Sequence, residues 1–151
     1  MNEVTKLATC FRSAIEISEI TNILPFFEFF PKNCCEHVSV FLGFYVSLKY
    51  PDLQIEIVRG KCETQSGIEY HLWLEINGQV FDLTLDQFEG YEVPIFGVAE
   101  HPMSSEFCED KRDFIDSYMP YYYDRVLEIP RFSRGISSIV SKLKVTGWKY
   151  A

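Results

Sequence analysis

The dipeptide Asn77-Gly78 stands between two runs of β-forming residues, Ile68–Ile76 and Gln79–Leu85. Such a dipeptide is the strongest short-range signal for a two-residue β-hairpin turn, because both residues tolerate the positive φ angles that the turn requires. The turn also sets the pairing register. In this register Ile76 pairs with Gln79, Leu74 with Phe81, Trp73 with Asp82, Leu72 with Leu83, and His71 with Thr84.

The hairpin has an apolar and a polar face, because side chains alternate between the two faces of a strand. The apolar face holds Leu72, Leu74, Ile76, Phe81 and Leu83, and the polar face holds His71, Trp73, Glu75, Val80, Asp82 and Thr84. His71 and Asp82 are diagonal neighbours on the polar face, with Cα atoms about 7–8 Å apart or less. A carboxylate at that position can bond one ring nitrogen and orient the imidazole.

A helix is predicted to begin just after Asn33, because Asn33 and Glu36 have the spacing of a helix cap and its N3 partner. The helix is expected to run to about Lys49 and to carry Cys34 and Cys35 at its first two positions. A helix N-terminus stabilises an anion, so it favours the thiolate, which is the nucleophilic form of cysteine. A cysteine, a histidine and an aspartate are therefore predicted in a nucleophile–base–orienter arrangement.

Three segments resemble the motifs of transglutaminase-like and papain-like cysteine enzymes. The segment Phe30–Ser39 (FPKNCCEHVS) resembles the nucleophile motif, Gly-x-Cys with a small residue four positions after the cysteine. In that alignment Asn33 takes the place of the glycine and Ser39 that of the small residue, which selects Cys35 as the nucleophile.

The second and third motifs follow in the order expected of that family. His71-Leu-Trp resembles the second motif, and Asp82-Leu-Thr resembles the third. The three motifs together lie within residues 30–88. The resemblance implies an α+β chain of the transglutaminase-like (papain-like) fold, in which the helix that bears the nucleophile packs on an antiparallel sheet.

The resemblance also implies a function. Cys35, His71 and Asp82 would be catalytic, Trp73 would shield the His–Asp pair, Asn33 would belong to the substrate-binding region, and no metal or cofactor would be needed. The reaction would pass through a thioester on amide or acyl bonds of a protein or peptide. A narrow-specificity protease or protein glutamine deamidase is favoured; acyl transfer, as in transglutaminases, is the alternative within the class. Outside this class of enzymes, the alternative is a non-enzymatic immunity or adaptor module on the same fold.

Several residues compete for these roles. Cys34 shares the environment of Cys35 and is the alternative nucleophile, and Asp86 is the alternative orienter. His37 is expected at the surface, because it lies about 200° around the helix from Cys35. His101 precedes a proline and is expected in a loop. A zinc site built from Cys34, Cys35, His37, Cys62 and Cys108 is disfavoured, because these residues lack the usual ligand spacing.

The rest of the chain indicates one domain over residues 1–151. Helices are predicted over residues 3–19, 106–118 and 133–144, strands over Leu53–Val58 and 93–98, and a packed loop at Leu24–Pro31. An aromatic-rich stretch lies at Tyr121–Tyr123.

Charge and hydropathy narrow the class of partners. The net charge of −8 argues against general nucleic-acid binding. Residues 119–151 carry six Lys and Arg against two Asp and Glu, and this basic segment could face an acidic partner. The first residues lack the pattern of a secretory signal, and no apolar stretch approaches the ~20 residues that span a bilayer. A cytoplasmic protein without membrane association is therefore expected, with its five cysteines reduced.

Overall fold

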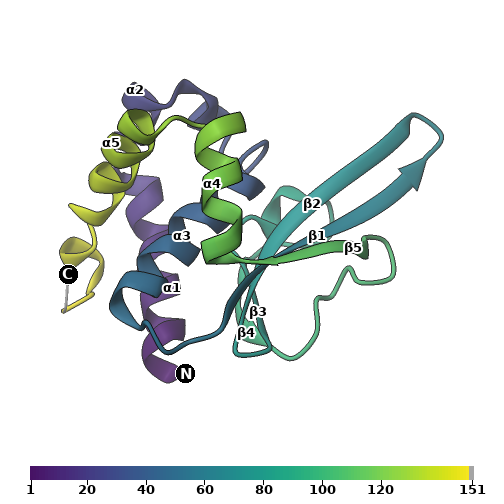
Figure 1. The fold of residues 1–151 in the computed structure, drawn as a ribbon, viewed down its shortest axis with the longest axis horizontal. Helices are drawn as coiled ribbons and strands as arrows, with labels where there is room; N and C mark the ends of the chain where they lie inside the picture. The colour runs from purple at the N-terminus through teal and green to yellow at the C-terminus, as the bar shows by residue number, and fades with distance from the viewer. Residues whose placement is uncertain (150–151) are drawn as a thin grey trace.

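The computed structural model describes residues 1–149 and combines a group of helices with a five-stranded antiparallel sheet, which confirms the α+β class. In Figure 1 the helices gather on one side and the sheet extends from them. The elements in chain order are α1 (Asn2–Ile17), α2 (Ile20–Ile23), η1 (Pro25–Phe29), α3 (Cys35–Lys49), β1 (Ile55–Thr64), β2 (Gly67–Ile76), β3 (Gln79–Asp82), η2 (Leu85–Gln87), β4 (Ile95–Val98), β5 (Cys108–Phe114), α4 (Ile115–Arg125), α5 (Ile129–Val140) and η3 (Lys144–Thr146). The strand order in the sheet is β4-β3-β2-β1-β5.

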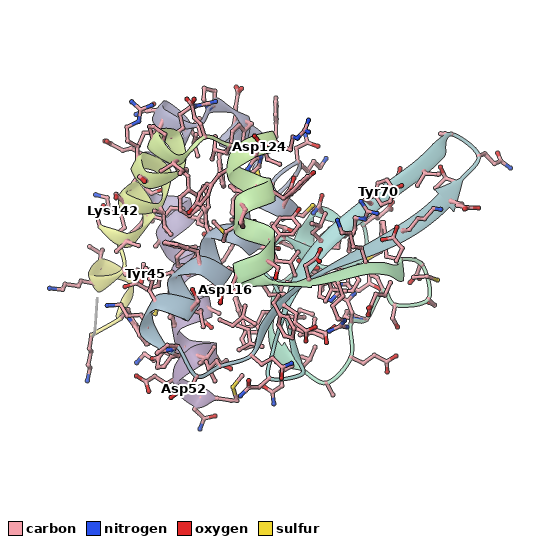
Figure 2. All side chains as sticks on the ribbon, in the orientation of Figure 1. Tyr45, Asp52, Tyr70, Asp116, Asp124 and Lys142 are labelled. Atoms are coloured by element: carbon pink, nitrogen blue, oxygen red, sulfur yellow. The ribbon has the colours of Figure 1, made fainter. Side chains whose placement is uncertain are left out.

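The hairpin between β2 and β3 has the predicted turn. Asn77 and Gly78 both have positive φ, at 48° and 79°, and Ile76 pairs with Gln79 as the register requires. The β2–β3 ladder continues to Leu74 and Phe81, and β3 ends at Asp82, so the more distant predicted pairs do not form. On its other side β2 pairs with β1 from Ile76 to Gly67, in a long hairpin that projects from the helices and carries Tyr70 (Figure 2).

Both faces of the sheet are covered. The main core lies between the sheet and the helices and includes Leu74, Ile76 and Phe81 from the predicted apolar face. The face predicted to be polar lies under a second apolar cluster, which contains Val58, Trp73, Val80, Leu85, Met103 and Phe107. The segment after β3 folds back over this face, and therefore His71, Asp82 and Thr84 on it are buried rather than exposed to solvent.

Helix α3 begins one residue later than predicted, at Cys35 rather than at Cys34. Cys34 is the N-cap residue and makes no side-chain capping bond, so the predicted capping role of Asn33 is wrong. Asn33 instead adopts a left-handed conformation with φ of 62°, which asparagine tolerates better than most residues. This conformation turns the chain immediately before the helix.

Other boundaries differ where the periodicity of the sequence is weak. The helix predicted over 106–118 is wrong, because residues 108–114 form the edge strand β5 and the helix α4 begins at Ile115. This strand is charged and exposed along most of its length, so it has no apolar alternation to reveal it. β1 extends past Val58 to Thr64 for the same reason, and α5 begins at Ile129 rather than at 133.

Among the described residues, no helix has both the length and the apolar character that crossing a membrane requires.

Candidate functional site

His71 and Asp82 are in direct contact, as the hairpin register predicts. Nε2 of His71 lies 2.6 Å from Oδ2 of Asp82, and each residue is only 1% exposed. His71 lies in β2, and Asp82 is the last residue of the neighbouring strand β3. The other carboxylate oxygen of Asp82, Oδ1, accepts hydrogen bonds from the backbone N–H and the hydroxyl of Thr84, at 3.0 and 3.3 Å.

A second histidine, His101, completes the surroundings of this carboxylate. Its Nε2 atom lies 2.8 Å from Oδ2 of Asp82, and the residue is 4% exposed. The backbone N–H of Met103 donates to Nδ1 of His101 at 3.0 Å, so Nδ1 is the acceptor nitrogen and the ring proton resides on Nε2. His101 is therefore a neutral donor to Asp82.

His71 and Asp82 each stabilise the charged form of the other. Burial opposes protonation of His71, but the Asp82 carboxylate outweighs it and, with a smaller contribution from the Cys35 thiol, raises the pKa of His71 above its ordinary value. Burial likewise favours the neutral acid at Asp82, yet the positive charge of His71 and the hydrogen bonds from both histidines lower the pKa of that carboxyl. The ionised carboxylate of Asp82 accepts a hydrogen bond from the Nε2–H group of His71, which leaves Nδ1 for another partner.

Aromatic rings enclose the two histidines. Phe88 meets the His71 ring edge to face with ring centres 4.8 Å apart, and Trp73 lies against His101 at 4.3 Å. Trp73 also lies beside His71, with ring centres 5.9 Å apart. Gly60, opposite His71 in β1, permits this packing, because a Cβ atom there would come within 2.7 Å of Phe107 and 2.9 Å of Trp73.

The two adjacent cysteines have different environments. Cys35 is the first residue of α3 and is partly exposed, and its thiol makes a small contribution to the raised pKa of His71. Cys34 is fully buried, and its thiol lies 3.7 Å from the carbonyl oxygen of Phe26. Burial raises the pKa of the Cys34 thiol to about 12, so this residue is poorly suited to be a nucleophile.

The first turn of α3 is anchored to α4 by two side-chain hydrogen bonds. The hydroxyl of Tyr118 donates to the carboxylate of Glu36, and Nδ1 of His37 lies 2.7 Å from the hydroxyl oxygen of Tyr122. His37 also stacks on Phe26 with ring centres 4.1 Å apart. His37, which was expected at the surface, is therefore half-buried. Burial lowers the pKa of His37 to about 4, so the ring is neutral near pH 7.

Asp86 is not the partner of His71. Its carboxylate forms two hydrogen bonds of 2.7 Å with the guanidinium of Arg12 in α1. The same guanidinium donates to the carbonyl oxygen of Leu83. Arg12 therefore holds the segment that immediately follows Asp82, and Asp82 rather than Asp86 faces the histidine.

Three of these ligand-type atoms lie close enough together to suggest a metal site. One atom from each of His71, Asp82 and His101 falls within 4.8 Å of the others. A ligating histidine nitrogen must be deprotonated, but Nε2 of His101 carries a proton because Nδ1 accepts from Met103. The donor set therefore fits a hydrogen-bonded trio better than a metal centre.

The contacts of Asn33 and His101 could not be predicted from the sequence. Asn33 is exposed at the turn before α3, and no side-chain hydrogen bond ties it to His71 or Asp82 among residues 1–149. His101 was expected in a loop and does lie in one, but its contact with Asp82 could not be foreseen. The two residues are 19 positions apart, and no periodic pattern connects them.

No family model matches the chain, and no curated protein or solved structure matches it at a significant level.

Proposed function

We propose that this protein is a cysteine-dependent enzyme that acts on amide or acyl bonds, with Cys35 as nucleophile, His71 as general acid and base, and Asp82 as the residue that orients and charges His71. The observation that carries the proposal is the buried hydrogen bond of 2.6 Å between His71 and Asp82, beside a cysteine at the start of a helix. The motif resemblance to transglutaminase-like enzymes selects the same three residues.

Each group has a defined role in the proposed reaction. The Cys35 thiolate attacks the substrate carbonyl carbon, and a carbon–sulfur bond forms as the carbonyl π electrons move to oxygen. The tetrahedral intermediate collapses, the carbon–nitrogen bond breaks, and His71 gives its proton to the departing amine. Backbone N–H groups at the start of α3, including that of Cys35, are the proposed donors to the oxyanion.

The second half-reaction decides the class of enzyme. Water attacks the thioester while His71 takes its proton, which releases a carboxylic acid and restores the thiolate. A peptide bond as substrate makes the enzyme a protease, and a glutamine side chain makes it a deamidase that releases ammonia. An amine in place of water makes it an acyltransferase. We favour hydrolysis of a protein or peptide.

An activated ester tests the proposal without knowledge of the substrate. p-Nitrophenyl acetate should acetylate Cys35 in a burst of nitrophenolate, and mass spectrometry of the peptides should place the acetyl group on Cys35. The variant His71→Ala should lose the burst, whereas Cys10→Ala should keep it. Acetylation of Cys108, the exposed cysteine, in preference to Cys35 would contradict the proposal.

A non-enzymatic binding module is the alternative outcome. Such a module has no need for a reactive thiol, so Cys35 would then acetylate no faster than an unstructured cysteine peptide at the same pH.

A further inference from the structure

The outer half of β2 has a free edge. β1 pairs with β2 along its whole length, from Ile76 to Gly67, whereas β3 pairs with it only from Ile76 to Leu74. Residues 67–70 of β2 are all exposed to solvent. Over this exposed part, one edge of β2 is therefore without a neighbouring strand among residues 1–149.

The side to which each backbone group of β2 points follows from the hydrogen bonds near its inner end. In an antiparallel ladder, the N–H and C=O groups of successive residues point to opposite sides of the strand. Asn77, just after β2, donates its backbone N–H to the carbonyl oxygen of Gln54, on the β1 side. The carbonyl oxygen of Leu72 lies 3.5 Å from the hydroxyl of Ser39 in α3, on the other side. The residues of even number in β2 therefore point away from β1.

Ile68 and Tyr70 are the even-numbered residues of the exposed part. Their backbone N–H and C=O groups point to the free edge, and no backbone hydrogen bond from residues 1–149 reaches them there. Their side chains are 51% and 47% exposed. A row of unpaired backbone groups on an exposed edge is the surface with which an added strand pairs.

Helix α3 runs beside β2 in the same direction and in step with it. Ser39 of the helix approaches Leu72 of the strand. Gly43, about one turn later, packs on Leu74, two residues later in the strand, and a Cβ atom at Gly43 would lie 3.2 Å from the Leu74 side chain. Four helix residues advance by about 6 Å and two strand residues by about 6.7 Å, so the two elements stay level over a further turn.

One turn towards the start of α3, the same series places Cys35 level with Tyr70. His71, which directly follows Tyr70 in β2, has a raised pKa to which the Cys35 thiol contributes, in agreement with this placement. The free edge of β2 therefore lies beside the proposed nucleophile.

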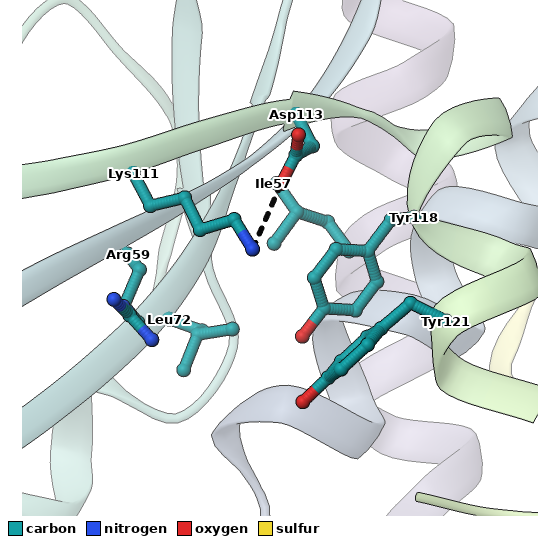
Figure 3. A pocket seen from close by; sticks show the side chains of 7 residues that line it. All are labelled: Ile57, Arg59, Leu72, Lys111, Asp113, Tyr118 and Tyr121. Carbon is teal, nitrogen blue, oxygen red and sulfur yellow. Dashed lines mark ion pairs between the residues drawn. The ribbon is translucent and has the colours of Figure 1, made fainter. Parts of the chain in front are cut away.

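The edge strand β5 differs from this part of β2. It carries five consecutive charged residues, 109–113, and charged side chains on an edge oppose the addition of another strand. Figure 3 shows Lys111 of β5 paired with Asp113, with 3.7 Å between Nζ and the carboxylate. The exposed part of β2 has the sequence Gly-Ile-Glu-Tyr and contains neither lysine nor proline. The sheet is therefore more open to strand addition at β2 than at β5.

The cation nearest to the free edge is already engaged. The guanidinium of Arg59 lies over the ring of Tyr70, 4.4 Å from its centre, and forms two hydrogen bonds of 3.0 Å with Asp110. We therefore expect this edge to recognise backbone groups rather than the charge of a ligand.

We propose that a peptide substrate binds as an added β-strand along the free edge of β2, where its backbone pairs with Ile68 and Tyr70 and brings a carbonyl group to Cys35. The inference rests on the function proposed above and specifies the substrate class, an extended segment of a protein chain recognised mainly through its backbone. The two residues that bond on this side are about 6.7 Å apart, so the pairing engages roughly three or four substrate residues.

Amide exchange in Cys35→Ala protein tests the edge without any reaction. The probe is the neutral peptide acetyl-Ser-Val-Thr-Val-Thr-Ser-amide, and exchange of the β2 amides is followed by NMR. When the peptide occupies ~90% of the protein, the amides of Ile68 and Tyr70 should exchange about tenfold more slowly, because only the free tenth exchanges. The amides of Glu69 and His71 already face β1 and should change little. No protection of Ile68 and Tyr70 up to the solubility limit of the peptide would overturn the proposal.

An N-methylated peptide is the matched control for the probe. Methylation of the four central nitrogens keeps every side chain but removes the N–H groups that a strand donates to its neighbour. This analogue should give no protection of Ile68 and Tyr70. Equal protection by the two peptides would contradict strand addition, and this comparison needs no variant of β2.

A proline at position 70 tests the same edge from the side of the protein. Tyr70→Pro removes an N–H that faces away from β1, and proline is tolerated on an edge strand at such a position. Tyr70→Thr removes the same ring and keeps the N–H. Protection of Ile68 by the peptide should be lost in Tyr70→Pro and largely kept in Tyr70→Thr, with melting temperatures to verify that both variants fold. Protection that survives in folded Tyr70→Pro would overturn the proposal.

An N-iodoacetyl form of the peptide connects the edge to Cys35 in the wild-type protein. The Cys35 thiolate forms a bond to the methylene carbon as the carbon–iodine bond breaks and iodide leaves. This probe should label Cys35 on the order of tenfold faster than iodoacetamide, because binding holds the two reacting atoms together. Its N-methylated analogue should show no such gain, and equal rates for the two peptides would overturn the placement of the substrate beside Cys35.

The experiments separate this inference from the proposed function. The iodoacetamide rate alone tests whether Cys35 is an activated nucleophile, and the exchange of Ile68 and Tyr70 in Cys35→Ala protein tests the edge. A slow iodoacetamide reaction together with peptide-dependent protection would refute the nucleophile and support the edge as a peptide-binding site. Rapid labelling without protection would support the nucleophile and refute the edge.

Discussion

The His101 ring donates a hydrogen bond of 2.8 Å to Oδ2 of Asp82, the same oxygen that accepts from His71. The carboxylate is thus fixed from two sides in an almost solvent-free environment. His101 touches neither Cys35 nor the proposed position of the substrate carbonyl, so it is a positioning residue for the proposed reaction.

Replacement of His101 tests this role. In His101→Ala the buried carboxylate loses one donor, so the pKa of Asp82 should rise and the labelling of Cys35 at neutral pH should slow by roughly tenfold, as expected for a hydrogen bond to a charged group. His101→Gln, whose amide N–H can replace the donor, should recover part of the rate. A fall in melting temperature with an unchanged pH profile of labelling would assign His101 a purely structural role.

Asp82→Asn should affect both activity and folding. In serine enzymes with this arrangement the equivalent change lowers turnover by about 10⁴-fold, and a cysteine enzyme should lose on the order of 10–10³-fold because its thiol is more acidic. The amide NH₂ must also face N–H donors, either those of the two histidines or that of Thr84, which should cost roughly 1–3 kcal/mol of unfolding free energy.

Leu74→Ala provides the matched comparison on the opposite face of the same hairpin. It should lower the unfolding free energy by about 2–5 kcal/mol as a core truncation and should affect labelling of the remaining folded protein little. Denaturant unfolding and labelling rates, measured on both variants, check the contrast. An Asp82→Asn protein with wild-type labelling would remove Asp82 from the proposed mechanism.

The dependence of stability on pH follows from the raised pKa of His71 and the lowered pKa of Asp82. The raised pKa of His71 contributes stability that is fully present below pH ~6.5 and is lost as pH rises through the raised value. The lowered pKa of Asp82 contributes stability that is present above pH ~3.9 and is lost as pH falls through the lowered value. Melting temperatures of wild type and His71→Gln should therefore differ most between these limits and converge at alkaline pH. A difference that grows at alkaline pH would contradict the assignment.

His37 should make the folded protein less stable in acid, because its pKa is lowered on folding whereas that of His71 is raised. Its lowered pKa of about 4 means that the unfolded chain gains a proton below pH ~6.5 while the folded protein does not. Stability should therefore fall as pH decreases from 6.5 to about 4. His37→Gln should remove that part of the slope, measured as melting temperature against pH. An unchanged slope would show that His37 is already protonated in the folded protein.

The hairpin and the His71–Asp82 contact could be predicted because both depend on local rules. A two-residue turn determines register, and register determines which side chains meet across two strands. The start of the helix at Cys35 was predicted to within one residue, although the capping role of Asn33 on which the prediction depended is wrong.

The remaining features depend on contacts between distant parts of the chain. His101 reaches Asp82 through a loop without periodicity, and β5 pairs with β1 across about 50 residues. The half-buried ring of His37 contacts Tyr122, which lies 85 positions away. The apolar cluster over the predicted polar face forms because Met103 and Phe107 fold back onto it. None of these contacts can be predicted from the local pattern of residues.

The labelling rate of Cys35 against pH tests the central proposal most directly. Wild-type protein and the variants Cys34→Ala, Cys35→Ala and His71→Ala are treated with iodoacetamide from pH 5 to 9, and each cysteine is quantified by mass spectrometry. We predict rapid Cys35 labelling that is nearly constant through neutral pH in wild type and in Cys34→Ala, and that becomes slow and steeply pH-dependent in His71→Ala. A wild-type Cys35 that reacts slowly below pH 8 and follows the profile of an ordinary thiol, unchanged by His71→Ala, would contradict the thiolate–imidazolium mechanism.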